Sequence, residues 1–201
     1  MPRCVYHIQR GWAKMIKHHL ERDGLLIAPV TEGDLLQIWL WYSDVERYKH
    51  ATGLDKPITF EKMRDKYMEA RCSRWEFFFK VVEKQHGIML GVVKGRVHYL
   101  LKDEAWISSI LIDEAYQGAG VGHAVVSMLE EYFRSVWLIR WLYTGVLTSN
   151  IAGLEFWRSM GFMEVRKTRY QIVLNDRPED IVIMAKNLEC GSSLRCACAD
   201  L

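Results

Sequence analysis

A glycine-rich turn is the part of the sequence best suited to bind a ligand. It reads Gln117-Gly-Ala-Gly-Val-Gly122, and its three glycines let the main chain turn tightly and direct successive N–H groups at one point. The turn follows Ile107–Ile112, an expected strand rich in β-branched residues, and precedes a segment with the apolar spacing of a helix. Because its N–H groups lie at the positive end of that helix, we expect the turn to hold an anion such as a pyrophosphate.

Two common phosphate-binding motifs do not fit this turn. A P-loop requires Lys followed by Ser or Thr after its last glycine, and His123 follows Gly122 here. A Rossmann fingerprint, G-x-G-x-x-G, opens a parallel sheet, whereas this turn has the spacing G-x-G-x-G and follows segments that look antiparallel. Taken alone, the turn could also be an ordinary tight connection between a strand and a helix.

The turn resembles the Q/R-x-x-G-x-G/A signature of the GCN5-related N-acetyltransferases (GNAT), with Gln117, Gly120 and Gly122 in register. A second stretch, Asn150–Phe162, is similar to that family's N-x-x-A-x-x-x-Y-x-x-x-G-F signature, with Gly replacing Ala and Trp157 replacing Tyr. The two signatures occur in the family's order and at its separation. The resemblance covers roughly Leu25 to Leu188.

This resemblance implies that acetyl-CoA is the co-substrate. The pantetheine arm would add to the strand ending at Ile112, the pyrophosphate would lie on the turn, and a main-chain N–H near Leu111 or Ile112 would polarise the thioester oxygen. Asn150 could bind the pantetheine amide, cap its helix, or do both. The expected cofactor-binding residues are Ile110, Leu111, Ile112, Gln117, Gly118, Ala119, Gly120, Val121, Gly122, His123, Asn150 and Trp157.

The residues that relatives use to move protons are replaced in this chain. Trp157 stands where relatives have a Tyr acid, and an indole is only a hydrogen-bond donor. Gly145 stands where some relatives have a Glu base. Ser108 and Tyr143 are therefore the candidates for catalysis, by anchoring a water chain that removes a proton. We expect an N-acetyltransferase acting on a primary amine of a small molecule, an amino sugar or a peptide N-terminus; the alternative is a GNAT-fold sensor that binds acyl-CoA without chemistry.

The pattern of apolar residues predicts an α+β fold, in which helices flank a mixed, mostly antiparallel, twisted sheet. We expect an amphipathic helical extension over residues 1–24, a GNAT domain over 25–189 and a cysteine-containing tail over 190–201. The extension would pack on its own domain or on a second copy of the chain, giving a homodimer, rather than on a membrane. Strands are expected over residues 25–30, 76–83, 88–101, 105–112, 138–147 and 181–187, with bulges at Gly91 and Gly95 and a hairpin turn over 175–180.

Helices are expected over residues 35–42, 59–71 and 150–160, with Thr31 and Thr59 as capping residues. By resemblance, the first two helices would form the walls of the acceptor pocket. The aromatic residues that could line that pocket, or simply belong to the core, are Trp39, Tyr42, Tyr48 and Tyr67.

Composition narrows the class of protein. The chain has 201 residues and a formal net charge of +2, which is too small for a typical nucleic-acid binder. The absence of a long apolar run or a signal-peptide pattern favours a cytoplasmic protein with no membrane segment. Cys190, Cys196 and Cys198 lack the paired spacing of common zinc sites, so no metal is expected.

Overall fold

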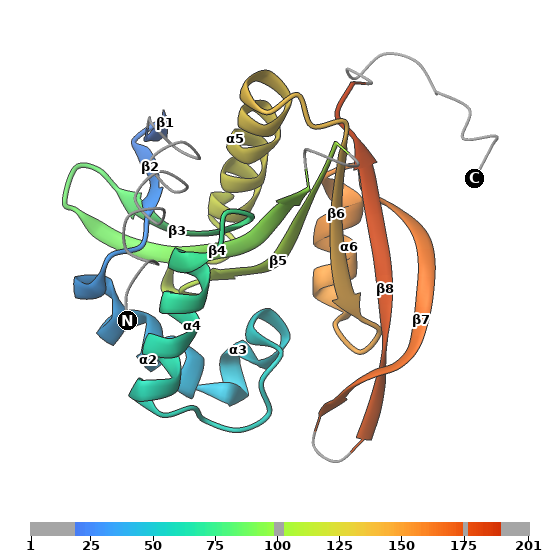
Figure 1. The fold of residues 1–201 in the computed structure, drawn as a ribbon, viewed down its shortest axis with the longest axis horizontal. Helices are drawn as coiled ribbons and strands as arrows, with labels where there is room; N and C mark the ends of the chain where they lie inside the picture. The colour runs from blue at the N-terminus through green and yellow to red at the C-terminus, as the bar shows by residue number, and fades with distance from the viewer. Residues whose placement is uncertain (1–18, 99–102, 175–176, 190–201) are drawn as a thin grey trace, which may run out of the picture.

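The computed structural model describes residues 19–98, 103–174 and 177–189. In this part of the chain, eight strands form one mixed sheet with helices on both faces, as Figure 1 shows, so the expected fold class is confirmed. The strands are β1 (Leu20–Arg22), β2 (Leu25–Pro29), β3 (Glu76–Glu83), β4 (Ile88–His98), β5 (Glu104–Ile112), β6 (Trp141–Leu147), β7 (Met163–Leu174) and β8 (Arg177–Asn187). The helices are η1 (Glu32–Asp34), α2 (Leu35–Ser43), α3 (Val45–Thr52), α4 (Phe60–Cys72), η2 (Glu114–Tyr116), α5 (Val121–Val136) and α6 (Ile151–Ser159).

The sheet has one parallel pair of strands, and these two strands diverge. The strand order is β1-β2-β3-β4-β5-β6-β8-β7, and every neighbouring pair except β5 and β6 is antiparallel. The β5–β6 ladder covers only Glu104–Ile107 paired with Trp141–Thr144. Beyond Ile107, β5 continues alongside β4 while β6 continues alongside β8, so the two parallel strands diverge.

Two hydrophobic clusters cover the two faces of the sheet. Because side chains alternate along a strand, Phe77 and Phe78 on β3 face opposite sides, with exposures of 0% and 2%. Phe77 belongs to the larger cluster, which includes α5 and α6. Phe78 belongs to the cluster formed with α2, α3 and α4. Each face of the sheet is therefore covered by helices that pack on it through one of the two clusters.

The sheet is irregular next to both glycines at which the sequence predicts bulges, in the β3–β4 pair near Gly91 and in the β4–β5 pair at Gly95. A Cβ on Gly91 would lie 2.2 Å from the Leu111 carbonyl oxygen, and one on Gly95 would lie 2.0 Å from that of Trp106. Only glycine permits these approaches. The register shifts between Lys94 and Gly95, which leaves Ser108 as the extra residue of a bulge on β5.

The expected helix starts are confirmed. Asp34 accepts a hydrogen bond from the Thr31 main-chain N–H at 2.7 Å, and the Thr59 side chain accepts one from the Lys62 N–H at 3.3 Å. Asn150 likewise accepts from the Gly153 N–H at 2.9 Å and begins α6.

Three expectations about secondary structure are wrong. The helix expected over residues 1–24 cannot reach its last residues, because Leu20–Arg22 pairs with β2 as a strand; residues 1–18 lie outside the described residues. The hairpin turn is shorter than 175–180, since β8 already begins at Arg177. Helix α3 was not expected, although Asp44 caps its start and Gly53 ends it with a φ of 69°.

Candidate functional site

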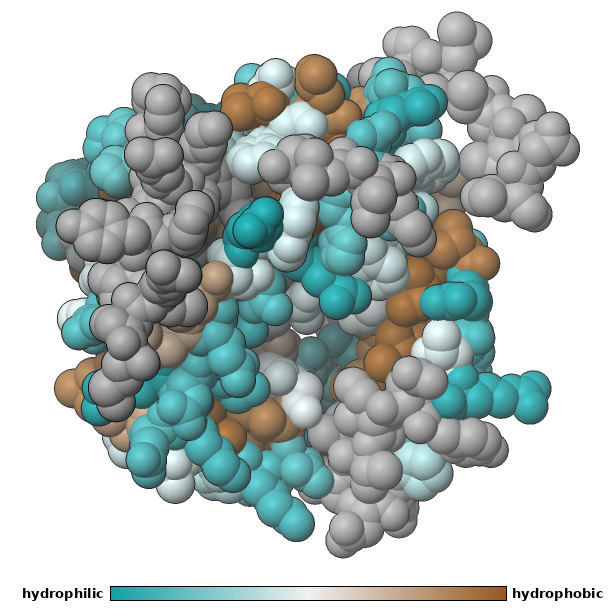
Figure 2. Space-filling model, viewed as in Figure 1, coloured by the Kyte–Doolittle hydropathy of each residue, from teal (hydrophilic) through white to brown (hydrophobic). Residues whose placement is uncertain are grey.

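A groove opens where β5 and β6 diverge. Its volume is about 670 Å³, and it is bordered by the end of β5, the glycine-rich turn, β6, α6 and α3. Figure 2 shows this face of the molecule hollowed near its centre, between the α2–α4 side and the β6–α6 side. All the expected cofactor-binding residues except Leu111 and Ala119 line the groove.

The free edge of β5 supplies main-chain hydrogen-bonding groups to this groove. The Asp113 N–H donates to the Leu90 carbonyl on β4 at 2.8 Å, so the main-chain groups of Leu111, two residues earlier, face β4 as well. By the same alternation, Ile110 and Ile112 direct theirs to the side from which β6 has diverged. The expectation for Leu111 is therefore wrong: its backbone pairs with Val92, and its side chain, 1% exposed, lies in the α2–α4 cluster.

The glycine-rich turn has the conformation that an anion-binding turn needs. Gly118 and Gly120 have φ values of 76° and 80°, and no atom lies within 4 Å of where either Cβ would be. The space next to both glycines is therefore open, and it lies at the start of the 16-residue helix α5. The Gln117 side chain folds back and donates to the Ile112 carbonyl at 2.8 Å, which fixes the turn to the end of β5.

Contacts behind the turn hold it in place. The Trp41 indole donates to the Asp113 carboxylate at 2.8 Å, which ties α2 to the start of the turn. A Cβ on Gly122 would lie 3.3 Å from the Phe156 ring, so α5 begins in close contact with α6. His123 bonds Ser159 on α6 at 3.0 Å. These residues therefore position the donors of the turn against the wall formed by α6.

Trp157 and Asn150 form that wall together. Trp157 lines the groove but is only 5% exposed, and its ring makes edge contacts with Phe156 and Phe162. The Oδ1 atom of Asn150 caps α6, while its amide nitrogen remains available to the groove.

Substitutions of Asn150 separate its two expected roles. Asn150→Ala should lower the free energy of unfolding by about 1 kcal/mol, because the cap is lost. Asn150→Asp keeps an acceptor oxygen at the cap and should leave stability nearly unchanged, but it removes the N–H donors. We expect both variants to bind CoA more weakly, by up to about tenfold, in calorimetric titrations. Wild-type affinity in Asn150→Asp would leave Asn150 with the capping role alone.

Helix α3 brings Tyr48, already a candidate from the sequence, and His50, which the sequence did not predict, to the groove. Tyr48 accepts a hydrogen bond from the Glu114 N–H at 3.1 Å and joins α3 to η2. His50 also lines the groove, and burial, followed by the charge of Lys49, lowers the pKa of His50 below its ordinary value. The sequence contained a signal for this short helix, because Asp44 caps its start and Gly53 ends it.

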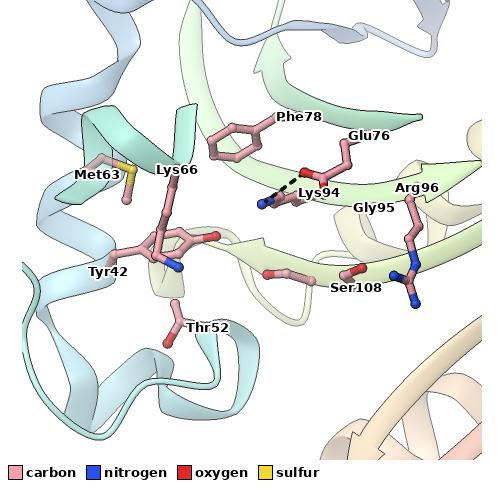
Figure 3. A pocket seen from close by; sticks show the side chains of 11 residues that line it. Tyr42, Thr52, Met63, Lys66, Glu76, Phe78, Lys94, Gly95, Arg96 and Ser108 are labelled. Atoms are coloured by element: carbon pink, nitrogen blue, oxygen red, sulfur yellow. Dashed lines mark ion pairs between the residues drawn. The ribbon is translucent and has the colours of Figure 1, made fainter. Parts of the chain in front are cut away.

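A second cavity of about 220 Å³ adjoins the groove. Ser108 and Ser109 line both the cavity and the groove, so the two spaces meet at the bulge of β5. Figure 3 shows side chains from α2, α4, β3 and β4 around this cavity, among them Tyr42, Lys66, Glu76 and Lys94.

The aromatic residues considered for an acceptor pocket have different positions. Tyr42 lines the second cavity and Tyr48 lines the groove. Trp39 and Tyr67 line neither: the Trp39 indole donates to the Ile58 carbonyl at 2.8 Å, and Arg71 lies over the Tyr67 ring.

Of the two catalytic candidates, only Ser108 is at the junction of the cavities. Tyr143 lines neither cavity, and its ring stacks on Trp106 with 4.9 Å between the centroids. Burial, and then the charge of Glu104, raise the pKa of Tyr143. Ser109 Oγ is engaged with the Ala51 carbonyl at 2.6 Å, whereas no hydrogen bond from the Ser108 side chain occurs within the described residues. Ser108 is thus the hydroxyl available there.

The described residues contain neither a membrane-spanning helix nor a metal-binding cluster. None of their helices is both long and apolar enough to cross a membrane. No group of three or more His, Cys, Asp or Glu side chains among them is arranged to hold a metal ion. The cysteines at 190, 196 and 198 lie outside this part of the chain.

Comparisons with known proteins agree on one family. Residues 27–183 match the family model described as an acetyltransferase (GNAT) domain. The [Ribosomal protein bS18]-alanine N-acetyltransferase of Escherichia coli K12 is 33% identical over 84 residues, which is 41% of this chain and 55% of that protein. The match thus spans about half the length of that relative.

Solved structures share the fold at lower identity. Spermidine N-acetyltransferase from Vibrio cholerae, in complex with CoA and spermine, has a TM-score of 0.74 at 18% identity over 84% of this chain and 98% of that one. Ribosomal-protein-S5-alanine acetyltransferase from Vibrio fischeri has a TM-score of 0.69 at 15% identity over 86% and 97%.

Proposed function

The chain belongs to the GNAT acetyltransferase family, and on that premise we propose that it transfers the acetyl group of acetyl-CoA directly to a primary amine in a ternary complex. Acetyl-CoA is the co-substrate that this family uses. One observation carries the proposal: the groove between β5 and β6 meets a second cavity at Ser108 and Ser109. Two substrates could therefore approach each other from opposite sides of the β5 bulge.

The groove suits CoA along its length. The turn Gln117–Gly122 would hold the pyrophosphate with main-chain N–H groups, which need no lysine. The free edge of β5 at Ile110 and Ile112 would pair with the amides of the pantetheine arm, as an added strand does. One of these N–H groups could also stabilise the oxyanion that forms when the amine attacks the thioester.

Proton balance decides which amines react readily. The attack forms a C–N bond and breaks the C–S bond, so the amine must lose a proton and the thiolate leaves. A thiol with a pKa near 8.5 leaves as thiolate at pH 7 for about 2 kcal/mol, which makes an acid dispensable. Deprotonating a lysine-like amine costs about 4.6 kcal/mol, and a peptide α-amine only about 1 kcal/mol.

His50, one of the residues that line the groove, is a candidate base. Because burial lowers its pKa, its imidazole is neutral at pH 7 and can accept a proton. It would remove the proton directly or through water held by Ser108. With Gly145 and Trp157 at the positions of the family's usual base and acid, this supports an acceptor whose amine pKa is low or is lowered on binding.

The alternative is a sensor that binds acyl-CoA and performs no transfer. Gly145 and Trp157 favour it, because neither can move a proton. The structure offers His50 in compensation, which favours the enzyme.

Initial rates measured while both substrates are varied test direct transfer. Reciprocal plots should intersect, since both substrates must be bound before the thioester is attacked. Parallel lines would instead indicate a covalent acetyl-enzyme and would overturn the ternary mechanism.

A further inference from the structure

The second cavity carries an excess of positive charge. Lys66 enters it from α4, and Lys94 and Arg96 enter from one face of β4. Glu76, on β3, is the one carboxylate among the described residues that line it. Figure 3 shows Lys66 and Arg96 at opposite ends of the cavity, with Lys94 and Glu76 between them.

The single carboxylate is already paired. Glu76 Oε2 is buried and lies 3.4 Å from Lys94 Nζ, with side-chain exposures of 36% and 25%. A lysine at this distance neutralises that carboxylate. Neither side chain therefore offers a full net charge to a ligand.

Lys66 and Arg96 remain uncompensated. Among the described residues neither forms an ion pair, although the Arg96 guanidinium lies 5.7 Å from the centre of the Trp106 ring. This contact uses the charge of the guanidinium and not its N–H donors, which can still meet a carboxylate. Two cations without a carboxylate partner among the described residues leave the cavity with a net positive charge, which favours an anionic group.

We propose that this cavity binds an anionic group of the acceptor, so that the preferred substrate is an amine that also carries a carboxylate. The inference rests on the proposed N-acetyl transfer and names its substrate class. Lys66 and Arg96 lie at opposite ends of the cavity, so the carboxylate would meet one of the two, according to the length of the acceptor, while the amine lies at Ser108 and Ser109, where the cavity meets the CoA groove. The volume of about 220 Å³ suits a compound of amino-acid size. A polycation such as a polyamine would meet two like charges and bind poorly.

Matched acceptors test the charge preference. Glycine, β-alanine and γ-aminobutyrate place the carboxylate at increasing distance from the amine, and their carboxamides remove the charge while keeping the shape. The quantity to measure is kcat/KM for each acid divided by kcat/KM for its amide. For at least one length, Lys66→Gln combined with Arg96→Gln should reduce this ratio by about tenfold or more. The difference in amine pKa between acid and amide cancels when the two proteins are compared.

The control carries the same change of net charge elsewhere. Lys62→Gln with Arg134→Gln removes two cations from α4 and α5 outside both cavities, and the ratio should stay at its wild-type value. If the control lowers the ratio as much as the test variant does, the effect comes from the overall field and the proposal is overturned. The proposal is also overturned if the test variant lowers the ratio for none of the three acceptor lengths.

A binding measurement separates this inference from the proposed function. The CoA-loaded protein should bind N-acetyl-γ-aminobutyrate or N-acetyl-β-alanine more tightly than the matching carboxamide, and the Lys66/Arg96 variant should lose that difference. This titration needs no turnover, so it supports or overturns the anion site even if no amine is acetylated. Acetylation of amines without any effect of Lys66 and Arg96 would overturn the inference alone and leave the proposed function standing.

Discussion

Gly120→Val is expected to weaken CoA binding by about a hundredfold or more, which corresponds to roughly 2.8 kcal/mol. Gly120 has a φ of 80°, which a β-branched residue adopts only with strain. No atom of the protein lies within 4 Å of its missing Cβ, so the new side chain would occupy the space in front of the turn, where the pyrophosphate is proposed to lie. Calorimetric titration with CoA measures the loss.

Gly87→Val is the matched control. Gly87 has a φ of 69° and equally open surroundings, but it lies in the turn between β3 and β4, away from the groove. Both variants should lose similar stability in thermal unfolding, and only Gly120→Val should lose CoA affinity. Wild-type affinity in Gly120→Val would show that the turn does not hold the pyrophosphate.

The rate of acetyl transfer is expected to rise about tenfold per pH unit below the pKa of the bound amine and then level off. Under these conditions the neutral amine is the reacting form. Once the pH falls below the lowered pKa of His50, the imidazole is protonated as well, and the slope should steepen to about two. Rates of thiol release across the pH range measure both limbs.

His50→Gln should lower the plateau and return the slope to about one, because a single protonation then controls the rate. No descending limb is expected at high pH, since Trp157 cannot act as an acid. A bell-shaped profile would reveal a proton donor elsewhere in the site. An unchanged profile in His50→Gln would remove His50 from the mechanism.

Local sequence patterns predicted the conformation of the part of the site where CoA is proposed to bind. The turn Gln117–Gly122 and the cap at Asn150 are local structures. Each is determined by the types of a few consecutive residues, so each can be predicted from the sequence. The error at Leu111 came from treating a whole strand segment as facing the ligand. The main-chain groups of a strand alternate between its two edges, so only every second residue can face the ligand, and the pairing of β5 with β4 turns those of Leu111 towards β4.

The acceptor side could not be predicted in the same way. Lys66, Glu76, Lys94 and Arg96 come from three elements, and in the sequence each looks like an ordinary surface charge. They meet only because β3 and β4 pair, with Arg96 opposite Glu76, and because α4 packs over that face. Strand β1 was missed for a related reason, since a three-residue strand gains its stability from pairing with β2 rather than from its own pattern.

Release of free thiol from acetyl-CoA, measured at about pH 9 with a panel of primary amines, tests the central claim most directly. The neutral fraction of a lysine-like amine is about a hundredfold larger at this pH than at pH 7, so the lack of a strong base limits the rate less. We predict that thiol appears only when the protein, acetyl-CoA and an amine are all present, in step with the acetylated amine. A protein that binds CoA tightly yet releases no thiol with any amine would contradict the enzyme and identify a sensor.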